Sequence, residues 1–423
     1  MASRKLTVVI MARLLPQING GVEQAVMGTV AALGRLNEGD EQYIVVTDPL
    51  APDWLNHCLG PNTRAVVASE PHWRTQTRRL LQPFSSEVDR AYIGARQVLS
   101  HLKEPRWSVG SYDPLIESLM ADVIHFPYQW MHLTSAPSIF NPQDLQHAHH
   151  PEFFDAYRNT FRQHMYPLWC NASTMVEVPS HASKDDLVTF LGVPMQKVAV
   201  VPKAPPHEFA LPLHTSSLSQ IRQKYDLPST FILYPAQTWP HKNHERLFAA
   251  LALLRDRYGV RLPLVCTGRR NDFWSTIRAK LHECGLTNQV RFPGYVSSQD
   301  LQALYHLAEF TVFPTLFEGG GLPLLEAFHE GSPLACSNIP VLAEQAHDAA
   351  LLFDPLSVED MARSILRLLK EPCLRDRLRE NGLIRLKQYS WEKTARTYRA
   401  MYRKIANRDL TEEDKALLCI ALT

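Results

Sequence analysis

The sequence predicts an α/β fold made of two doubly wound domains, each built on a parallel sheet. Short apolar runs rich in β-branched residues alternate with segments of helical periodicity along the whole chain. The alternation stops once, between Pro202 and Ser229, where prolines, serines and threonines gather. The length of 423 residues also exceeds what one hydrophobic core usually organises.

The first predicted domain, residues 1–205, begins with a strand at Leu6–Ala12, whose unbroken apolar run is typical of a buried parallel strand. A loop with Gly20 and Gly21 follows, and Val22–Leu33 has apolar residues at helical spacing. Further strands of this domain are predicted at residues 43–47, 64–68, 122–126, 175–179 and 198–201.

Residues 206–229 are predicted to be a linker, and residues 230–423 a second domain whose last helix is expected to pack back on the first. Its strands are predicted at residues 231–234, 263–266, 290–292, 310–313, 333–336 and 350–353. Helices are predicted at residues 245–258, 275–284 and 299–308.

Composition excludes several classes of protein. The 44 Lys and Arg residues balance 43 Asp and Glu residues, so no excess charge favours nucleic acid. None of the seven cysteines forms a C-x-x-C pair, which argues against a zinc ribbon or a redox motif and fits a reducing compartment. Apolar runs are too short for a membrane span or a signal peptide, so a cytoplasmic protein is expected.

Glycine is scarce but clustered. Five of the 18 glycines form two groups, Gly20-Gly21 and Gly319–Gly321, and each group follows a predicted strand and opens a helix. Because ligands of open α/β sheets bind at the carboxyl ends of strands, both groups are candidate binding loops. We expect the two groups to face each other across a cleft between the domains, on either side of one ligand.

The most informative segment is Pro314–Ala327, with the sequence PTLFEGGGLPLLEA. The three glycines allow close approach of a ligand, and Pro323 suits the first turn of a helix whose free N–H groups favour an anion. Glu318 and Glu326 can only accept hydrogen bonds when ionised, so they suit the hydroxyl groups of sugars. Their spacing alone is uninformative; the strand, glycine and helix context gives it meaning.

EGGGLPLLEA resembles the E-x7-E motif of retaining GT-B glycosyltransferases of glycosyltransferase family 4. The resemblance extends to GGVEQ (20–24), PHKNHERL (240–247), RFPGYVSSQDLQALY (291–305) and YSWEKTA (389–395). It implies two Rossmann-like domains facing a central cleft and transfer of a sugar from a nucleoside-diphosphate sugar to a saccharide or lipid-linked saccharide. It implies neither a cofactor nor an essential metal. PHKNH and DLQHAHHPEFF are similar to segments of bacterial polysaccharide mannosyltransferases, which favours GDP-mannose, with glucose and N-acetylglucosamine donors left open.

The resemblance also implies roles for individual residues. Glu318 corresponds to the glutamate at the donor sugar, Glu326 to the glutamate on the ribose, and Lys242 to the lysine on the diphosphate. The remaining implied donor contacts are the backbone of Gly319, Gly320, Gly321 and Leu322, the phosphate-side loop at Gly20 and Gly21, and Val296 beside the base.

Two positions depart from the family pattern. The arginine usual before the lysine is missing, and Gln237 or Thr238 could bond phosphate there without charge, while Arg269 or Arg270 could supply the charge. Gln143 stands where the family has histidine, which leaves Asp144 and His147 as candidate catalytic contacts. A given histidine among 18 is nevertheless more often structural than functional.

Trp73–Leu81 mixes basic and apolar residues. It permits a weak peripheral contact with an anionic membrane at the cytoplasmic face, although an ordinary solvated face is the favoured interpretation.

Three other functions remain as alternatives. They are a nucleotide-sugar epimerase or phosphorylase, a non-catalytic sugar-nucleotide-binding protein, and a nicotinamide-dependent oxidoreductase. The last lacks a G-x-G-x-x-G motif after the first strand.

Overall fold

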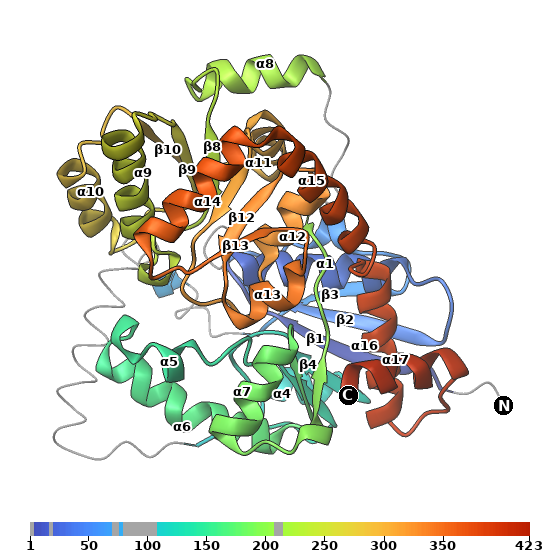
Figure 1. The fold of residues 1–423 in the computed structure, drawn as a ribbon. Coiled ribbons are helices and arrows are strands. Elements are labelled where there is room, and N and C mark those ends of the chain that lie inside the picture. The colour runs from blue at the N-terminus through green and yellow to red at the C-terminus, as the bar shows by residue number, and fades with distance from the viewer. Residues whose placement is uncertain (1–3, 17–19, 70–75, 79–107, 207–214) are drawn as a thin grey trace. The chain divides into compact units, whose positions relative to one another are not determined.

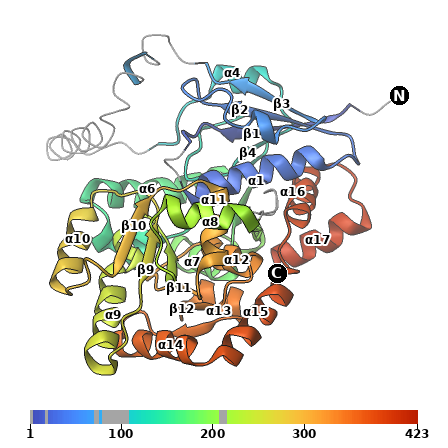
Figure 2. The same cartoon turned by 90° about the horizontal axis from the view of Figure 1, so that it is seen from above.

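The computed structural model describes residues 4–16, 20–69, 76–78, 108–206 and 215–423 (Figure 1). The chain divides into two compact units. The first consists of residues 1–203 and 391–423, and the second of residues 204–390. Each unit contains one parallel sheet accompanied by helices, which confirms the predicted fold class (Figure 2).

The first unit has a seven-stranded sheet in the order β3-β2-β1-β4-β5-β6-β7, with every neighbouring pair parallel. Its strands are β1 (Leu6–Ala12), β2 (Glu41–Thr47), β3 (Thr63–Val67), β4 (Val123–Phe126), β5 (Ser138–Phe140), β6 (Met175–Val178) and β7 (Val198–Val200). The chain builds outward from β1 in both directions, so the strand order reverses between β1 and β4. Such a switch point is where ligands of open α/β sheets bind.

The helices described in the first unit are α1 (Gly21–Arg35), α4 (Pro114–Ser118), α5 (Gln146–His149), α6 (Ala156–Ala172), α7 (His181–Leu191), α16 (Trp391–Ile405) and α17 (Glu412–Leu422). Helix α16 packs directly on α1: a side chain added at Gly28 would overlap the buried ring of Trp391.

A buried polar cluster also attaches α16 to the first sheet. Glu177 of β6 accepts hydrogen bonds from Lys203 (Nζ–Oε2, 3.1 Å) and from the hydroxyl of Tyr398 on α16. His125 of β4 contacts the other carboxylate oxygen of Glu177 (3.2 Å) and the hydroxyl of Tyr402 (2.8 Å). Burial alone would raise the pKa of Glu177, but Lys203, His125 and Tyr398 together lower it to about 2.

The second unit has a six-stranded parallel sheet in the order β10-β9-β8-β11-β12-β13. Its strands are β8 (Ile232–Pro235), β9 (Leu264–Thr267), β10 (Val290–Gly294), β11 (Thr311–Phe313), β12 (Leu334–Ser337) and β13 (Leu351–Phe353). The strand order reverses between β8 and β11, which places a second switch point there.

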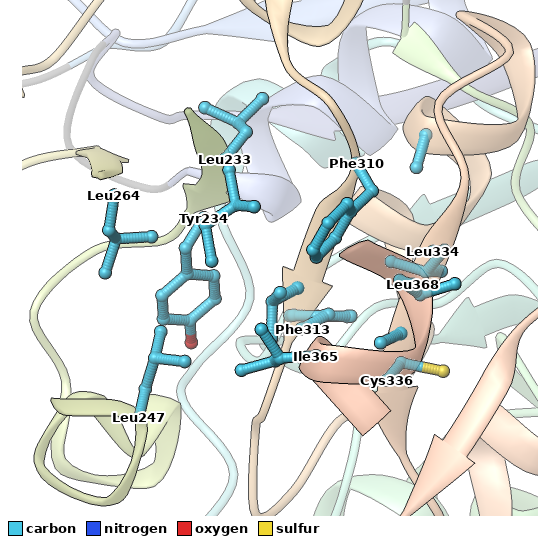
Figure 3. Packing of buried hydrophobic residues seen from close by; sticks show 14 of the residues in the cluster. Leu233, Tyr234, Leu247, Leu264, Phe310, Phe313, Leu334, Cys336, Ile365 and Leu368 are labelled. Atoms are coloured by element: carbon cyan, nitrogen blue, oxygen red, sulfur yellow. The ribbon is translucent and has the colours of Figure 1, made fainter. Parts of the chain in front are cut away.

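Eight helices are described in the second unit: α8 (Thr215–Lys224), α9 (His244–Tyr258), α10 (Trp274–Glu283), α11 (Ser298–Leu307), α12 (Leu322–His329), α13 (Pro340–Ala346), α14 (Val358–Lys370) and α15 (Pro372–Leu386). Side chains from the strands and these helices form one hydrophobic core. Figure 3 shows part of it, including Tyr234 and Phe313 from the two switch-point strands and Ile365 of α14.

The compact units differ from the predicted domain limits at two places. Residues 391–423 belong to the first unit rather than to a domain ending at 423, because α16 and α17 bury their apolar faces there. The predicted linker 206–229 contains helix α8, which lies in the second unit. One strand, β5, was not predicted; it has only three residues and lies between two prolines, Pro137 and Pro142.

In the described part of the chain, no helix is both long and apolar enough to span a membrane.

Candidate active site

The candidate site of the second unit lies where β8 and β11 end, at the switch point of its sheet. The backbone N–H of Leu316 donates to the carbonyl of His241 (2.7 Å), joining the two loops that follow these strands. Asn243, in the left-handed region with φ 60°, donates through Nδ2 to the carbonyls of Pro314 and Pro355, both at 2.9 Å. These bonds fix the loop that carries Lys242 against the loop that carries Glu318.

Lys242 and Glu318 form an ion pair between Nζ and Oε1. The hydroxyl of Tyr234 holds the backbone of this loop by donating to the Lys242 carbonyl (2.5 Å). The lysine side chain is 15% exposed and the glutamate side chain 12% exposed. Because little water reaches the pair, its charges are screened less than surface charges, yet both groups remain accessible to a ligand.

The three glycines connect Glu318 to the start of α12. Gly321 adopts a left-handed conformation (φ 48°, ψ 36°) that favours glycine, and a Cβ there would overlap the side chain of Gln345. Gln345 donates through Nε2 to the carbonyl of Gly320 (3.0 Å), which fixes the loop. Leu322 and Pro323 then begin the helix, so its positive end follows Glu318, the partner of Lys242, by four residues.

Glu326 lies one turn inside α12 and is almost buried, with 8% exposure. Its Oε2 accepts a hydrogen bond from the hydroxyl of Tyr305 on α11 at 2.8 Å. The carboxylate of Glu326, which was predicted from the sequence, is therefore oriented by a hydrogen bond from Tyr305 of the neighbouring helix α11.

Thr238 and Gln237, the predicted phosphate contacts without charge, both bond within the protein. The buried hydroxyl of Thr238 donates to Oδ1 of Asn271 (2.9 Å) and accepts from the Asn271 backbone N–H (2.8 Å). Gln237 accepts from the indole N–H of Trp239 (2.9 Å). Thr238 thus joins the loops after β8 and β9, and its hydroxyl is occupied.

The two arginines after β9 differ in their surroundings. Arg270 donates to the carbonyl of Phe292 (2.9 Å) and lies over the ring of Trp274, 4.4 Å from its centroid. Arg269 is exposed, and its carbonyl accepts the N–H of Thr238 at 3.2 Å; among the residues that the structure describes, its guanidinium makes no observed hydrogen bond. Arg269 is therefore the better placed of the two to supply the missing positive charge.

Val296, the predicted base contact, has its side chain in the hydrophobic core of the second unit. The preceding Tyr295 is 51% exposed, and Gly294 has φ 85°. Since the valine side chain is buried, the backbone of this segment is the part available to a ligand.

The other predicted residues lie in the first unit. Gly20 precedes α1 with φ 52° and ψ −121°, a conformation that favours glycine, and Gly21 is the first residue of the helix. Both follow β1 at the switch point of the first sheet; residues 17–19 of the same loop are outside the described ranges.

Asp144 and Gln143 follow β5. Gln143 has φ 68° and donates through Nε2 to the carbonyl of Pro127 (3.0 Å), so its side chain stabilises the loop. Asp144 is half-buried, and its Oδ1 accepts the N–H of Gln146 at 3.0 Å.

His147 is buried in the first unit, with only 2% exposure. Its ring packs edge-on against Tyr166, at 5.1 Å between centroids, and against Phe154. Burial first, and then the nearby Arg162 and His149, lower its pKa to about 4. These surroundings favour the neutral form of the ring.

The structure thus brings together Lys242, Glu318, Gly319–Gly321 and Leu322, with Glu326 one turn further along. It also identifies supporting residues that sequence reasoning missed: Asn243, Asn271, Tyr305 and Gln345. Asn243 and Tyr305 lie within the segments that carry the family resemblance, which was an available signal.

The predicted membrane stretch Trp73–Leu81 lies outside the described residues except for 76–78. Within that part, Arg78 pairs with the buried carboxylate of Asp48 at 2.9 Å.

Comparison with known proteins identifies the class of protein. The family model for glycosyl transferases group 1 matches residues 219–385, which include every predicted site residue of the second unit. The solved structure of HepE from Anabaena, in complex with UDP and glucose, superposes with a TM-score of 0.68 at 15% identity, covering 94% of this chain and all of HepE. The two sheets and the likeness to HepE show a GT-B fold. The family match to the second unit indicates a glycosyltransferase, and the alternatives considered from sequence are not favoured.

Two curated relatives are similar to this chain over part of its length. The chain is 27% identical over 299 residues to O-antigen chain mannosyltransferase B of Escherichia coli, covering 70% of this chain and 75% of the relative. It is 31% identical over 219 residues to the serotype-specific mannosyltransferase WbdA of Escherichia coli, covering 51% of this chain and only 27% of WbdA.

Proposed function

We propose that the protein transfers mannose from GDP-mannose to a saccharide or lipid-linked saccharide, with retention of the anomeric configuration. The observation that carries the proposal is the ion pair of Lys242 with Glu318, which lies four residues before the start of α12. This arrangement offers a cation and helix N–H groups to a diphosphate, and a carboxylate to the hydroxyls of a sugar.

The leaving group of this reaction is a nucleoside diphosphate. Lys242 and the positive end of α12 would stabilise the charge that develops on its phosphate oxygen as the bond to the sugar breaks. The exposed guanidinium of Arg269 adds a second positive charge in place of the missing family arginine. The proposal invokes no metal, because these groups supply the positive charge.

The sugar carbon would pass through an oxocarbenium-like transition state. The bond from the anomeric carbon to the phosphate oxygen breaks, and a bond to the acceptor oxygen forms on the same face. The acceptor proton passes to the departing phosphate. Glu318 would orient the donor sugar through its hydroxyls, and Asp144 is proposed as an acceptor-side contact.

Mannose and GDP are supported by the two relatives, whose names describe mannosyltransferases, and by the PHKNH segment around Lys242. HepE was solved with UDP and glucose, so the fold also accommodates a uridine donor.

The experiment is a donor panel of GDP-mannose, UDP-glucose and UDP-N-acetylglucosamine with mannose oligosaccharides as acceptors, followed by NMR of the product linkage. The proposal predicts transfer from GDP-mannose to an α-linked product. Transfer from a uridine donor alone would overturn the donor assignment, and a β-linked product would overturn retention.

A further inference from the structure

Two neighbouring helices of the second unit, α11 and α12, meet through buried polar groups. The hydroxyl of Tyr305 on α11 donates to Oε2 of Glu326 on α12 (2.8 Å) and lies 3.3 Å from the carbonyl of Pro323. Tyr305 is 1% exposed and Glu326 is 8% exposed. A hydrogen bond to a charged group is stronger than one between neutral groups, and its strength increases where water is excluded.

The next residue of α11 makes a second contact with α12. His306 approaches Oε2 of Glu330 through Nε2 (2.7 Å), and His329 approaches the other oxygen through Nδ1 (2.8 Å). Consecutive residues of one helix therefore meet carboxylates one turn apart on the other. The register of α11 against α12 is fixed, and with it the position of the Tyr305 hydroxyl.

We propose that Tyr305 is a positioning residue that orients the Glu326 carboxylate toward the ribose of the donor nucleotide and so sets the preference of the site for ribose over deoxyribose. This inference rests on the proposed function, in which Glu326 binds the ribose hydroxyls.

The physical argument concerns the rotation of a carboxylate. An ionised carboxylate can accept about four hydrogen bonds, so the bond from Tyr305 restricts the orientation of the Glu326 carboxylate without using all of its acceptor capacity. Loss of that bond would give the glutamate side chain more rotational freedom, and binding of the ribose would then have to restrict more of that freedom. Burial, followed by the charges of Glu326 and Glu330, holds the pKa of Tyr305 well above its usual range, so the phenol stays a donor.

The test measures affinity for GDP and for 2′-deoxy-GDP by calorimetry, and takes the ratio of the two dissociation constants. The wild-type ratio is expected to be about 10 or more, since a lost hydrogen bond to a charged group costs about 1.5–3 kcal/mol. In Tyr305→Phe the ratio should fall at least threefold, and in Glu326→Ala it should approach one. UDP and 2′-deoxy-UDP form a parallel series.

Tyr225→Phe is the matched control. Tyr225 also donates its hydroxyl to a carboxylate of α11, Asp300, at 2.5 Å, but outside the candidate site. In Tyr225→Phe the ratio of the dissociation constants for GDP and 2′-deoxy-GDP should equal that of the wild type.

The outcomes separate the two hypotheses. If the wild type shows no preference, or Glu326→Ala keeps it, the proposed ribose contact of Glu326 is wrong. If Glu326→Ala loses the preference while Tyr305→Phe keeps the wild-type ratio, the role of Tyr305 is overturned. Should Tyr305→Phe fail to fold, 3-fluorotyrosine introduced at position 305 keeps the ring and changes the strength of the hydrogen bond; an unchanged ratio would then overturn the inference.

Discussion

Lys242 and Glu318, which lie 76 residues apart in the sequence, form an ion pair where two adjacent strands of the second sheet end. A diphosphate would offer Lys242 more negative charge than one carboxylate does. We therefore expect Lys242 to exchange Glu318 for the diphosphate on binding, which leaves the Glu318 carboxylate to accept hydrogen bonds from the sugar.

Lys242→Ala should reduce turnover by about 10²–10³-fold, because the leaving diphosphate loses a charged donor. The measurement is kcat with the donor that the panel identifies. Lys280→Ala is the control: this lysine is also paired with a glutamate, Glu283 at 2.6 Å, but on the surface of α10. Equal turnover in Lys242→Ala and the control would show that Lys242 does not act on the leaving group.

Glu318→Gln should separate binding from transfer. The substitution removes the carboxylate that competes for Lys242, so GDP should bind at least as tightly as to the wild type. Transfer should fall, since the neutral amide is a weaker acceptor for sugar hydroxyls than the carboxylate. Weaker GDP binding in Glu318→Gln, measured by calorimetry, would contradict the exchange of partners.

Gly321→Ala should damage the loop before α12. The substitution combines an unfavourable φ of 48° with overlap against Gln345, so it should lower the melting temperature and weaken GDP binding. Gly259→Ala is the control, because Gly259 has φ 67° with nothing within 4 Å of an added Cβ. Gly259→Ala should lower the free energy of unfolding by only about 1 kcal/mol, the cost of the backbone strain, and should bind GDP as the wild type does. Equal GDP affinity in both variants would argue against the loop as a phosphate site.

Glu177→Gln should destabilise the protein by about 3–5 kcal/mol at neutral pH, because Lys203 would remain buried without its anionic partner. The measurement is urea denaturation. Glu371→Gln, which breaks an exposed ion pair with Arg367, should leave the melting temperature unchanged.

The lowered pKa of Glu177 predicts that the stability of the fold depends on pH. Its pKa is about 2 in the folded chain, below the ordinary value of 4.5, so its contribution is complete above pH 4.5 and is lost as pH falls toward 2. The difference in stability between the wild type and Glu177→Gln should therefore shrink across this range. A difference that is constant with pH would contradict an ionised Glu177.

His147 should remain neutral at physiological pH. Its pKa is lowered from 6.5 to about 4, so NMR titration of its ring should show no protonation between pH 8 and pH 6. A midpoint near 6.5 would show that the ring is exposed and available to a ligand.

Much of the fold could be predicted because the strands are apolar and unbroken. β1 was placed correctly at Leu6–Ala12, since an apolar run rich in β-branched residues and without alternation is typical of a buried parallel strand. β5 was missed because three residues between prolines carry no periodicity. The return of the last helix to the first domain was expected, but the inclusion of α16 in the first unit was not, because an amphipathic pattern shows that a face is buried but not against which sheet.

The candidate site also has features that could be anticipated from the sequence and features that could not. That Lys242 and Glu318 lie close together could be anticipated, because both follow strands whose carboxyl ends meet at one edge of a sheet. The bonds of Thr238 to Asn271 and of Tyr305 to Glu326 could not, because they depend on how loops and helices are registered after packing. The burial of His147 was likewise invisible in a short polar segment.

The central claim is that a nucleoside diphosphate binds beside Lys242 at the start of α12. Calorimetric titration of GDP and UDP into the wild type and into Lys242→Ala tests it most directly. We predict that the wild type binds at least one of the two and that Lys242→Ala binds it about 10- to 150-fold more weakly, as expected for loss of a charged hydrogen bond. Binding of neither nucleotide, or equal affinity in both proteins, would contradict the account.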